Sequence, residues 1–188
     1  EVMAVILILA ILAGFLLINL RSAQDTLDDG LTQARIEGLV AAIGEYESEF
    51  GDWPPSTFEG SAAADEARID SINVGAEALF LALYGTEWQS SAEMKDEDLS
   101  NSDGDRSKKA LSSFPSRELF EVCDVWGNPI AYIHNADYGT MFVYRTIDPE
   151  TGEELESDVR AQKSGKTGQY QNPRSYQLRS AGLDGRFG

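Results

Sequence analysis

The residues that could carry out catalysis or bind a metal are few in this chain of 188 residues. A single His and a single Cys exclude HExxH zinc sites, multi-cysteine metal sites and an internal disulfide framework. We interpret His134 as an ordinary residue of a predicted strand, and Cys123, which follows Val122 in an apolar run, as a buried free thiol. Because the sequence has no Ser/His/Asp arrangement, P-loop or GxGxxG motif, we expect that the protein is not an enzyme.

Oxygen ligands for a cation are concentrated in one stretch, where Asn101, Asp103 and Asp105 alternate with small residues. This spacing resembles part of a cation-binding loop, but the closing Glu of an EF-hand is missing. The surrounding residues, 87–118, are mostly polar and include many acidic side chains. We therefore interpret the stretch as a solvated acidic loop.

The charge balance restricts the partners of the protein. The chain has 32 Asp and Glu residues against 15 Lys and Arg residues, which gives a formal net charge of −17. Nucleic acids are bound by basic surfaces, so this composition argues against nucleic acid as a partner. Hydrophobic residues make up 42% of the chain, which is enough to form a packed core.

A charge-free stretch, Val2–Leu20, follows Glu1. As a helix it would be about 28 Å long, close to the thickness of a bilayer core of about 30 Å. It lacks the basic start and the small-residue cleavage site of a signal peptide. We therefore predict a membrane-competent helix that the mature protein retains, in preference to a buried core helix. Ala10 and Gly14 would allow close approach of a second helix, although small residues are also common in membrane helices generally.

The helical periodicity continues beyond this stretch. Apolar residues recur at alternating spacings of three and four from Ile36 to Phe50, which predicts one apolar stripe that packs against a domain. Leu27 and Leu31 extend this stripe toward the N-terminus. Gly51, followed by two prolines, predicts that the helix ends near residue 50.

The remainder of the chain predicts a mixed helical and β structure. Residues 74–84 predict a short buried helix, and residues 128–135 and 140–146 predict two strands joined as a hairpin. Residues 148–152 predict a turn, and residues 175–180 predict a third strand. The expected fold class is α+β, with the long helix packed on a small C-terminal antiparallel sheet.

These elements predict two parts of the chain. The first is a long N-terminal helix, 1–52, whose residues 1–20 are the hydrophobic segment. The second is a globular α+β head, 53–188, which contains a variable acidic insertion at about 56–119.

Three stretches together resemble a known family. Glu1 followed by an uninterrupted apolar segment is similar to the glutamate near the head of the family's hydrophobic helix. The stretch from Tyr46 to Pro54 resembles the family's helix exit, where an aromatic residue, Gly and Pro close the long helix. The sequences DVWGNP at 124–129 and YQLRSAGLDG at 176–185 resemble its sheet signature. The chain thus resembles the type IV pilin superfamily, and within it the major, G-type pseudopilin of type II secretion systems.

This resemblance implies a structural role in a helical filament of identical subunits. The hydrophobic N-terminal helices would form the shared core, and the heads would lie outside. Glu1 would form a salt bridge with the N-terminal amine of an adjacent subunit and so set the register. The candidate assembly residues are Glu1, Ala10, Gly14 and Phe15.

The resemblance also implies a location and a cation. The subunit would lie in the bacterial inner membrane and meet an inner-membrane assembly machinery before it enters a filament. Both a periplasmic pseudopilus and an extracellular surface pilus fit this reading. A membrane-tethered monomeric binding protein, exposed to the periplasm or the cell surface, is the alternative. No cofactor is expected other than calcium at the C-terminal DG motif, where Asp184 is the candidate ligand; alone it cannot supply six to eight oxygens.

Overall fold

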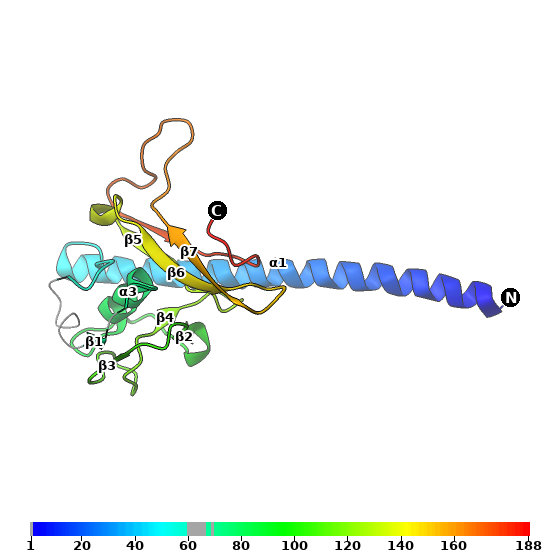
Figure 1. Ribbon diagram of the computed structural model, residues 1–188, viewed down its shortest axis with the longest axis horizontal. Coiled ribbons are helices and arrows are strands. Elements are labelled where there is room, and N and C mark those ends of the chain that lie inside the picture. The colour runs from blue at the N-terminus through cyan, green and yellow to red at the C-terminus, as the bar shows by residue number, and fades with distance from the viewer. Residues whose placement is uncertain (1, 60–66, 69) are drawn as a thin grey trace.

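The structure, a computed structural model, describes residues 2–59, 67–68 and 70–188. Side chains are described for Met3, Ile6 and Leu12 and from residue 23 onward, except at 67–68. The chain folds into a head gathered around one end of a single long helix, whose other end extends away from the head (Figure 1). The N-terminus lies at the far tip of this helix, and the C-terminus lies beside the helix, at the head (Figure 1).

The long helix, α1 (Val2–Phe50), contains 49 residues and is therefore about 73 Å long. Its predicted end near residue 50 is confirmed. Gly51 follows with a φ of 78°, and its N–H donates to the Glu47 carbonyl at 2.8 Å. This left-handed conformation is easily reached by glycine alone, so Gly51 terminates the helix.

The second half of α1 packs into the head through the predicted apolar stripe. Leu39, Ala42 and Ile43 are buried in the main core, against the second helix and the strands. The extension of the stripe is not covered, because Leu27 and Leu31 are 67% and 56% exposed. The contact between α1 and the head therefore begins after Leu31.

The predicted membrane segment, Val2–Leu20, lies in the N-terminal half of α1. Among the side chains that it describes, no helix combines the length and the apolar character needed to cross a membrane. Most side chains of the predicted segment, Val2–Leu20, lie outside the described residues.

The second helix, α3 (Val74–Tyr84), has the predicted bounds and lies at the centre of the head. Leu79, Phe80 and Leu83 bury one face of it against α1 and the strands. A Cβ atom at Gly75 would clash with the carbonyl oxygen of Tyr132 and the hydroxyl of Tyr144. Glycine at this position therefore lets the first turn of α3 approach the strands closely.

The strands form four antiparallel pairs around these helices. Short 3₁₀ helices, η1 (Asp96–Asp98) and η2 (Asn135–Asp137), interrupt the loops. The pairs are β1 (Ala67–Arg68) with β3 (Arg106–Ser107), β2 (Leu99–Ser100) with β4 (Glu121–Val122), β5 (Ala131–His134) with β8 (Tyr176–Arg179), and β6 (Phe142–Ile147) with β7 (Glu154–Val159).

This pairing corrects the predicted three-stranded sheet. The strands within 128–135 and 140–146 exist, but the predicted hairpin between them is wrong, because β5 pairs with β8 and β6 pairs with β7. After β5, η2 and a turn closed by the Thr140 N–H and the Asp137 carbonyl (2.8 Å) redirect the chain. The predicted turn at 148–152 is confirmed, and it joins β6 to β7 instead.

Strand β7 was not predicted, because its sequence, ELESDV, resembles a polar loop. Its acidic residues are stabilised by a partner on the neighbouring strand. Arg145 of β6 forms ion pairs with Glu156 at 2.9 Å and with Glu154 at 3.5 Å.

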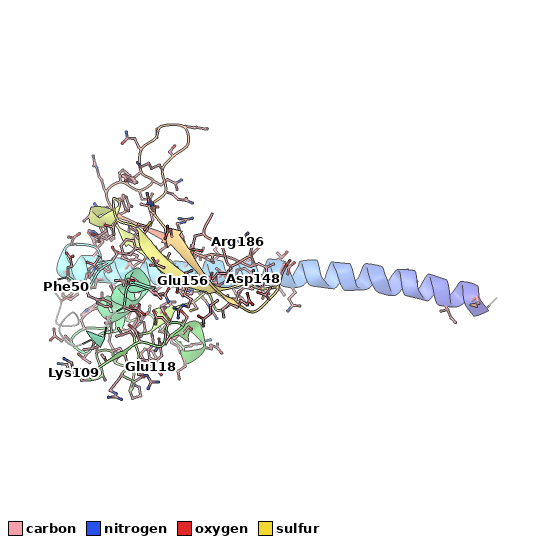
Figure 2. All side chains as sticks on the ribbon, viewed as in Figure 1. Phe50, Lys109, Glu118, Asp148, Glu156 and Arg186 are labelled. Carbon is pink, nitrogen blue, oxygen red and sulfur yellow. The ribbon has the colours of Figure 1, made fainter. Side chains whose placement is uncertain are left out.

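Glu156 lies over the middle of the head, whereas Asp148 and Arg186 lie near the point where α1 leaves the head (Figure 2).

Candidate functional site

Most of the predicted assembly residues lie where the structure describes little. Glu1 lies outside the described residues, and Ala10, Gly14 and Phe15 belong to α1 but their side chains are not described. The described apolar side chains of this half of α1 are Met3, Ile6 and Leu12, and all three are more than half exposed. The roles of the four predicted assembly residues stay predictions.

The junction between α1 and the head is fixed by Arg35. Its Nη1 donates to the carbonyl oxygens of Cys123 (3.0 Å) and Asp124 (2.9 Å), and its Nη2 pairs with Asp98 at 2.6 Å. Cys123 itself is buried, and burial raises the pKa of its thiol. The interpretation of this residue as a buried free thiol is confirmed.

The two sequence motifs of the predicted sheet signature meet at Asp124. One carboxylate oxygen of Asp124 accepts from the N–H groups of Trp126 and Asn128, both at 3.0 Å. The other accepts from the Ser180 hydroxyl at 2.6 Å. Asn128 extends the network, because its side chain donates to the Gly182 carbonyl and accepts from the Ile147 N–H. This hydrogen-bond network attaches the C-terminal segment to the strands.

The predicted calcium ligand, Asp184, lies apart from any cluster of acids that the structure describes. Its side chain is exposed, and one oxygen accepts from the Arg186 N–H at 3.1 Å. The described residues contain one group of carboxylates close enough to hold a metal, and Asp184 is not a member. Its role in calcium binding stays a prediction.

That group lies at the start of α3. Carboxylate oxygens of Glu77, Asp103 and Glu121 lie within 4.8 Å of one another. Glu77 comes from the first turn of α3, Asp103 from the loop between β2 and β3, and Glu121 from β4. Glu77 and Glu121 are fully buried, and Asp103 is partly exposed. Asp105 lies close enough to Glu77 for the two carboxyl groups to influence each other's pKa. We call these four residues the acidic cluster.

Asn73, immediately before α3, positions the acidic cluster. Its side-chain nitrogen donates to Glu121 and to the Ser102 hydroxyl, both at 2.7 Å. Its side-chain oxygen accepts from the Arg145 N–H at 2.9 Å, and its carbonyl accepts from the Glu77 N–H. One buried asparagine thus connects α3, β4, β6 and the loop that carries Asp103.

The carboxylates of the acidic cluster are poorly compensated. Both side-chain oxygens of Glu77 and of Asp105 are buried and have no hydrogen-bond donor. Burial, together with the neighbouring carboxylates, raises the pKa of Glu77 and of Asp105. Burial and the nearby Asp103 raise the pKa of Glu121 to about 8, although Asn73 opposes this shift. Buried acids without donors are costly in a folded protein.

Sequence reasoning found only part of this cluster. It identified Asp103 and Asp105, but the interpretation as a solvated loop is wrong for Asp105, whose carboxylate oxygens are buried. It missed Glu77 and Glu121. The available signal was a single acid in each of two apolar runs, VGAEALFLALY and LFEVC, because an acid in a buried segment needs a partner.

Comparison of the chain with protein-family models, with curated proteins and with solved structures finds no match.

Proposed function

We propose that the protein is a structural subunit of a helical filament of the pilin type, which assembles through the N-terminal half of α1. The observation that carries this proposal is the division of α1. Its second half is built into the core of the head, and its first half extends beyond the head (Figure 1). The extended half begins with the charge-free stretch Val2–Leu20.

The exposed apolar surface of α1 favours association. Met3 is 84% exposed, and Leu27 and Leu31 are more than half exposed. Burial of one such side chain contributes about 1.5–3 kcal/mol, so a row of them favours a neighbouring apolar surface. In a filament, the same half of α1 in adjacent subunits supplies that surface. In a bilayer, lipid supplies it before assembly.

Packing and charge pairing would then set the register of the filament. Apolar helices gain little from exchanging lipid for one another, so small residues and polar pairs decide how they associate. Ala10 and Gly14 supply small residues, and Phe15 supplies a large one. Glu1 would pair with the N-terminal amine of the next subunit, because an unpaired carboxylate among apolar helices is costly.

The test compares filament yield from Glu1→Ala with that from the unchanged chain. Negative-stain electron microscopy is applied to material sheared from cells and to a detergent extract of their membranes. We expect uniform filaments from the unchanged chain and few or none from Glu1→Ala, with the same tryptophan fluorescence from both folded heads. Glu49→Ala, at an exposed position near the other end of α1, is the matched control and should assemble normally.

The fraction that contains the filaments separates the two filament types. Long filaments in the sheared fraction indicate a surface pilus, and short filaments in the membrane extract indicate a pseudopilus. Single particles in both fractions, or a normal filament yield from Glu1→Ala, would contradict the proposal. Single particles alone are the result expected of a membrane-tethered monomeric binding protein.

A further inference from the structure

We propose that the acidic cluster, Glu77, Asp103, Asp105 and Glu121, binds one hard divalent cation of the size of calcium. The site lies in the head, far from the exposed half of α1 (Figure 1). The inference is independent of the filament proposal, because it depends only on the folded head.

The first argument is the lack of hydrogen-bond donors. Glu77 is 0% exposed, and neither of its carboxylate oxygens has a hydrogen-bond partner, although one of them lies within 4.8 Å of carboxylate oxygens of Asp103 and Glu121. Both carboxylate oxygens of Asp105 are likewise buried and have no hydrogen-bond partner. Native proteins rarely bury carboxylates in this way unless a cation or a shared proton compensates them. Three carboxylates lie within 4.8 Å of one another and Asp105 adjoins Glu77, so a divalent cation compensates the group more completely than one proton.

The second argument is that the described part of the head places no ion-pair partner at the cluster; the nearby charge of Arg145 offsets only part of the rise in the pKa of Asp103. Among the side chains that the structure describes, no Lys or Arg forms an ion pair with any of the four acids. The guanidinium of Arg145 donates to the Ser102 carbonyl at 3.4 Å, but it pairs with Glu154 and Glu156 on β7. The guanidinium charge of Arg145 is therefore already shared with the two acids of β7.

The third argument is the chemistry and spacing of the ligands. All four side chains of the acidic cluster offer carboxylate oxygen, which hard cations such as Ca²⁺ prefer, and the three that lie within 4.8 Å of one another are all acids. Two oxygens bound to one Ca²⁺ at about 2.4 Å can lie up to about 4.8 Å apart. The oxygens of Glu77, Asp103 and Glu121 fall within this limit. Mg²⁺ usually keeps several waters and binds only one or two carboxylates, so a set of four carboxylates suits Ca²⁺ better.

The bound cation would connect parts of the head that are distant in sequence. Glu77 belongs to α3, Glu121 belongs to β4, and the two aspartates belong to the loop between β2 and β3. Asp103 and Asp105 are partly exposed, which gives the ion a path from solvent. The cation would therefore attach this acidic loop to the central helix.

The test measures calcium binding by the full chain in detergent micelles after treatment with EDTA. Isothermal titration with CaCl₂ should show one Ca²⁺ per chain, with a dissociation constant of about 1 mM or tighter. Saturating CaCl₂ should raise the melting temperature, followed by tryptophan fluorescence, by about 5–10 °C. MgCl₂ at equal concentration should give a smaller rise.

Variants identify the ligands. Glu77→Gln and Asp105→Asn should each weaken calcium binding at least tenfold and lose the thermal shift. In EDTA, both should melt at or above the temperature of the unchanged protein, because the neutral amide needs neither a proton nor a cation to compensate it. This opposite response separates loss of a ligand from simple misfolding. Asp96→Asn, an exposed acid in η1 of the same acidic stretch, should bind calcium normally.

Three outcomes would overturn the proposal. The first is the absence of calcium binding by the unchanged chain, which would leave shared protons to compensate the acids. The second is calcium binding that survives in both cluster variants. The third is binding that is lost on Asp184→Asn but kept in the cluster variants, which would place the cation in the C-terminal turn.

Discussion

Two buried acids in the same head, Asp124 and Glu77, differ in how their charges are compensated. Asp124 is 1% exposed and Glu77 is 0% exposed. The oxygens of Asp124 accept hydrogen bonds from Trp126, Asn128 and Ser180. The oxygens of Glu77 accept none and lie among other carboxylates. Burial alone therefore does not distinguish a structural acid from a ligand, whereas the supply of donors does.

The difference has a local cause. Asp124 lies in a turn, where the backbone N–H groups of the next few residues point back at its side chain. Glu77 lies in the first turn of α3, where its own N–H donates to the Asn73 carbonyl and neither carboxylate oxygen accepts a hydrogen bond. The turn thus supplies donors to Asp124 from its own sequence, whereas Glu77 depends on groups from elsewhere in the fold.

The largest effect expected from this comparison is that of Asp124→Ala. The substitution leaves two backbone N–H groups and the Ser180 hydroxyl without their acceptor, which should lower the free energy of unfolding by about 3 kcal/mol. Urea denaturation followed by tryptophan fluorescence measures it. Asp184→Ala, at an exposed position, is the control and should change stability by less than about 0.5 kcal/mol. Equal stabilities of the two variants would contradict the structural role of Asp124.

A smaller effect is expected from pH on the calcium-free protein. The pKa of Glu121 rises from 4.5 to about 8 on folding, so the folded state holds its proton more tightly than the unfolded state. The stability from this proton is complete below about pH 4.5 and is lost as pH rises toward about 8. The pKa values of Glu77, Asp103 and Asp105 are also raised, so they act in the same direction.

Melting temperatures in EDTA, measured at intervals from pH 5 to pH 8.5, should therefore fall by several degrees toward the higher pH. The same series is measured on the Glu121→Gln variant, whose melting temperature should fall less between pH 5 and pH 8.5. A flat profile for the unchanged protein would show that the acids of the cluster are compensated in the absence of added cation.

The smallest effect is expected from Ser180→Ala, which removes one donor from Asp124 and the acceptor of the Gly182 N–H but leaves the two backbone donors to Asp124 in place. Each such hydrogen bond contributes about 1 kcal/mol to stability, so the loss should be smaller than that for Asp124→Ala. Urea denaturation of the double variant, Asp124→Ala with Ser180→Ala, completes a double-mutant cycle. Because the two side chains contact each other, the effects of the single variants should not add. Strict additivity would show that the hydroxyl contributes nothing through Asp124.

Several elements were predictable from the sequence because they depend on neighbouring residues. The end of α1 at Phe50 follows from the glycine after it, and α3 has the bounds that its apolar run predicts. The turn at 148–152 is likewise a local property, because Asp148 accepts from the N–H groups of residues just after it. The contact between Asp124 and Ser180 was not predicted directly; the sequence only placed the two residues in the two motifs of the predicted sheet signature.

The pairing of strands and the acidic cluster depended on the tertiary structure. Strand β6 could pair with β5 or β7; it pairs with β7 along its whole length, and Arg145 adds ion pairs with acids of an otherwise polar stretch. The acids of the cluster come from three elements between residues 77 and 121, and no sequence pattern aligns them. The sequence by itself determined where the helices and turns lie, because hydrogen bonds and periodicity act over a few residues. Only the tertiary structure decided which acids share a buried space, because that depends on how distant segments pack.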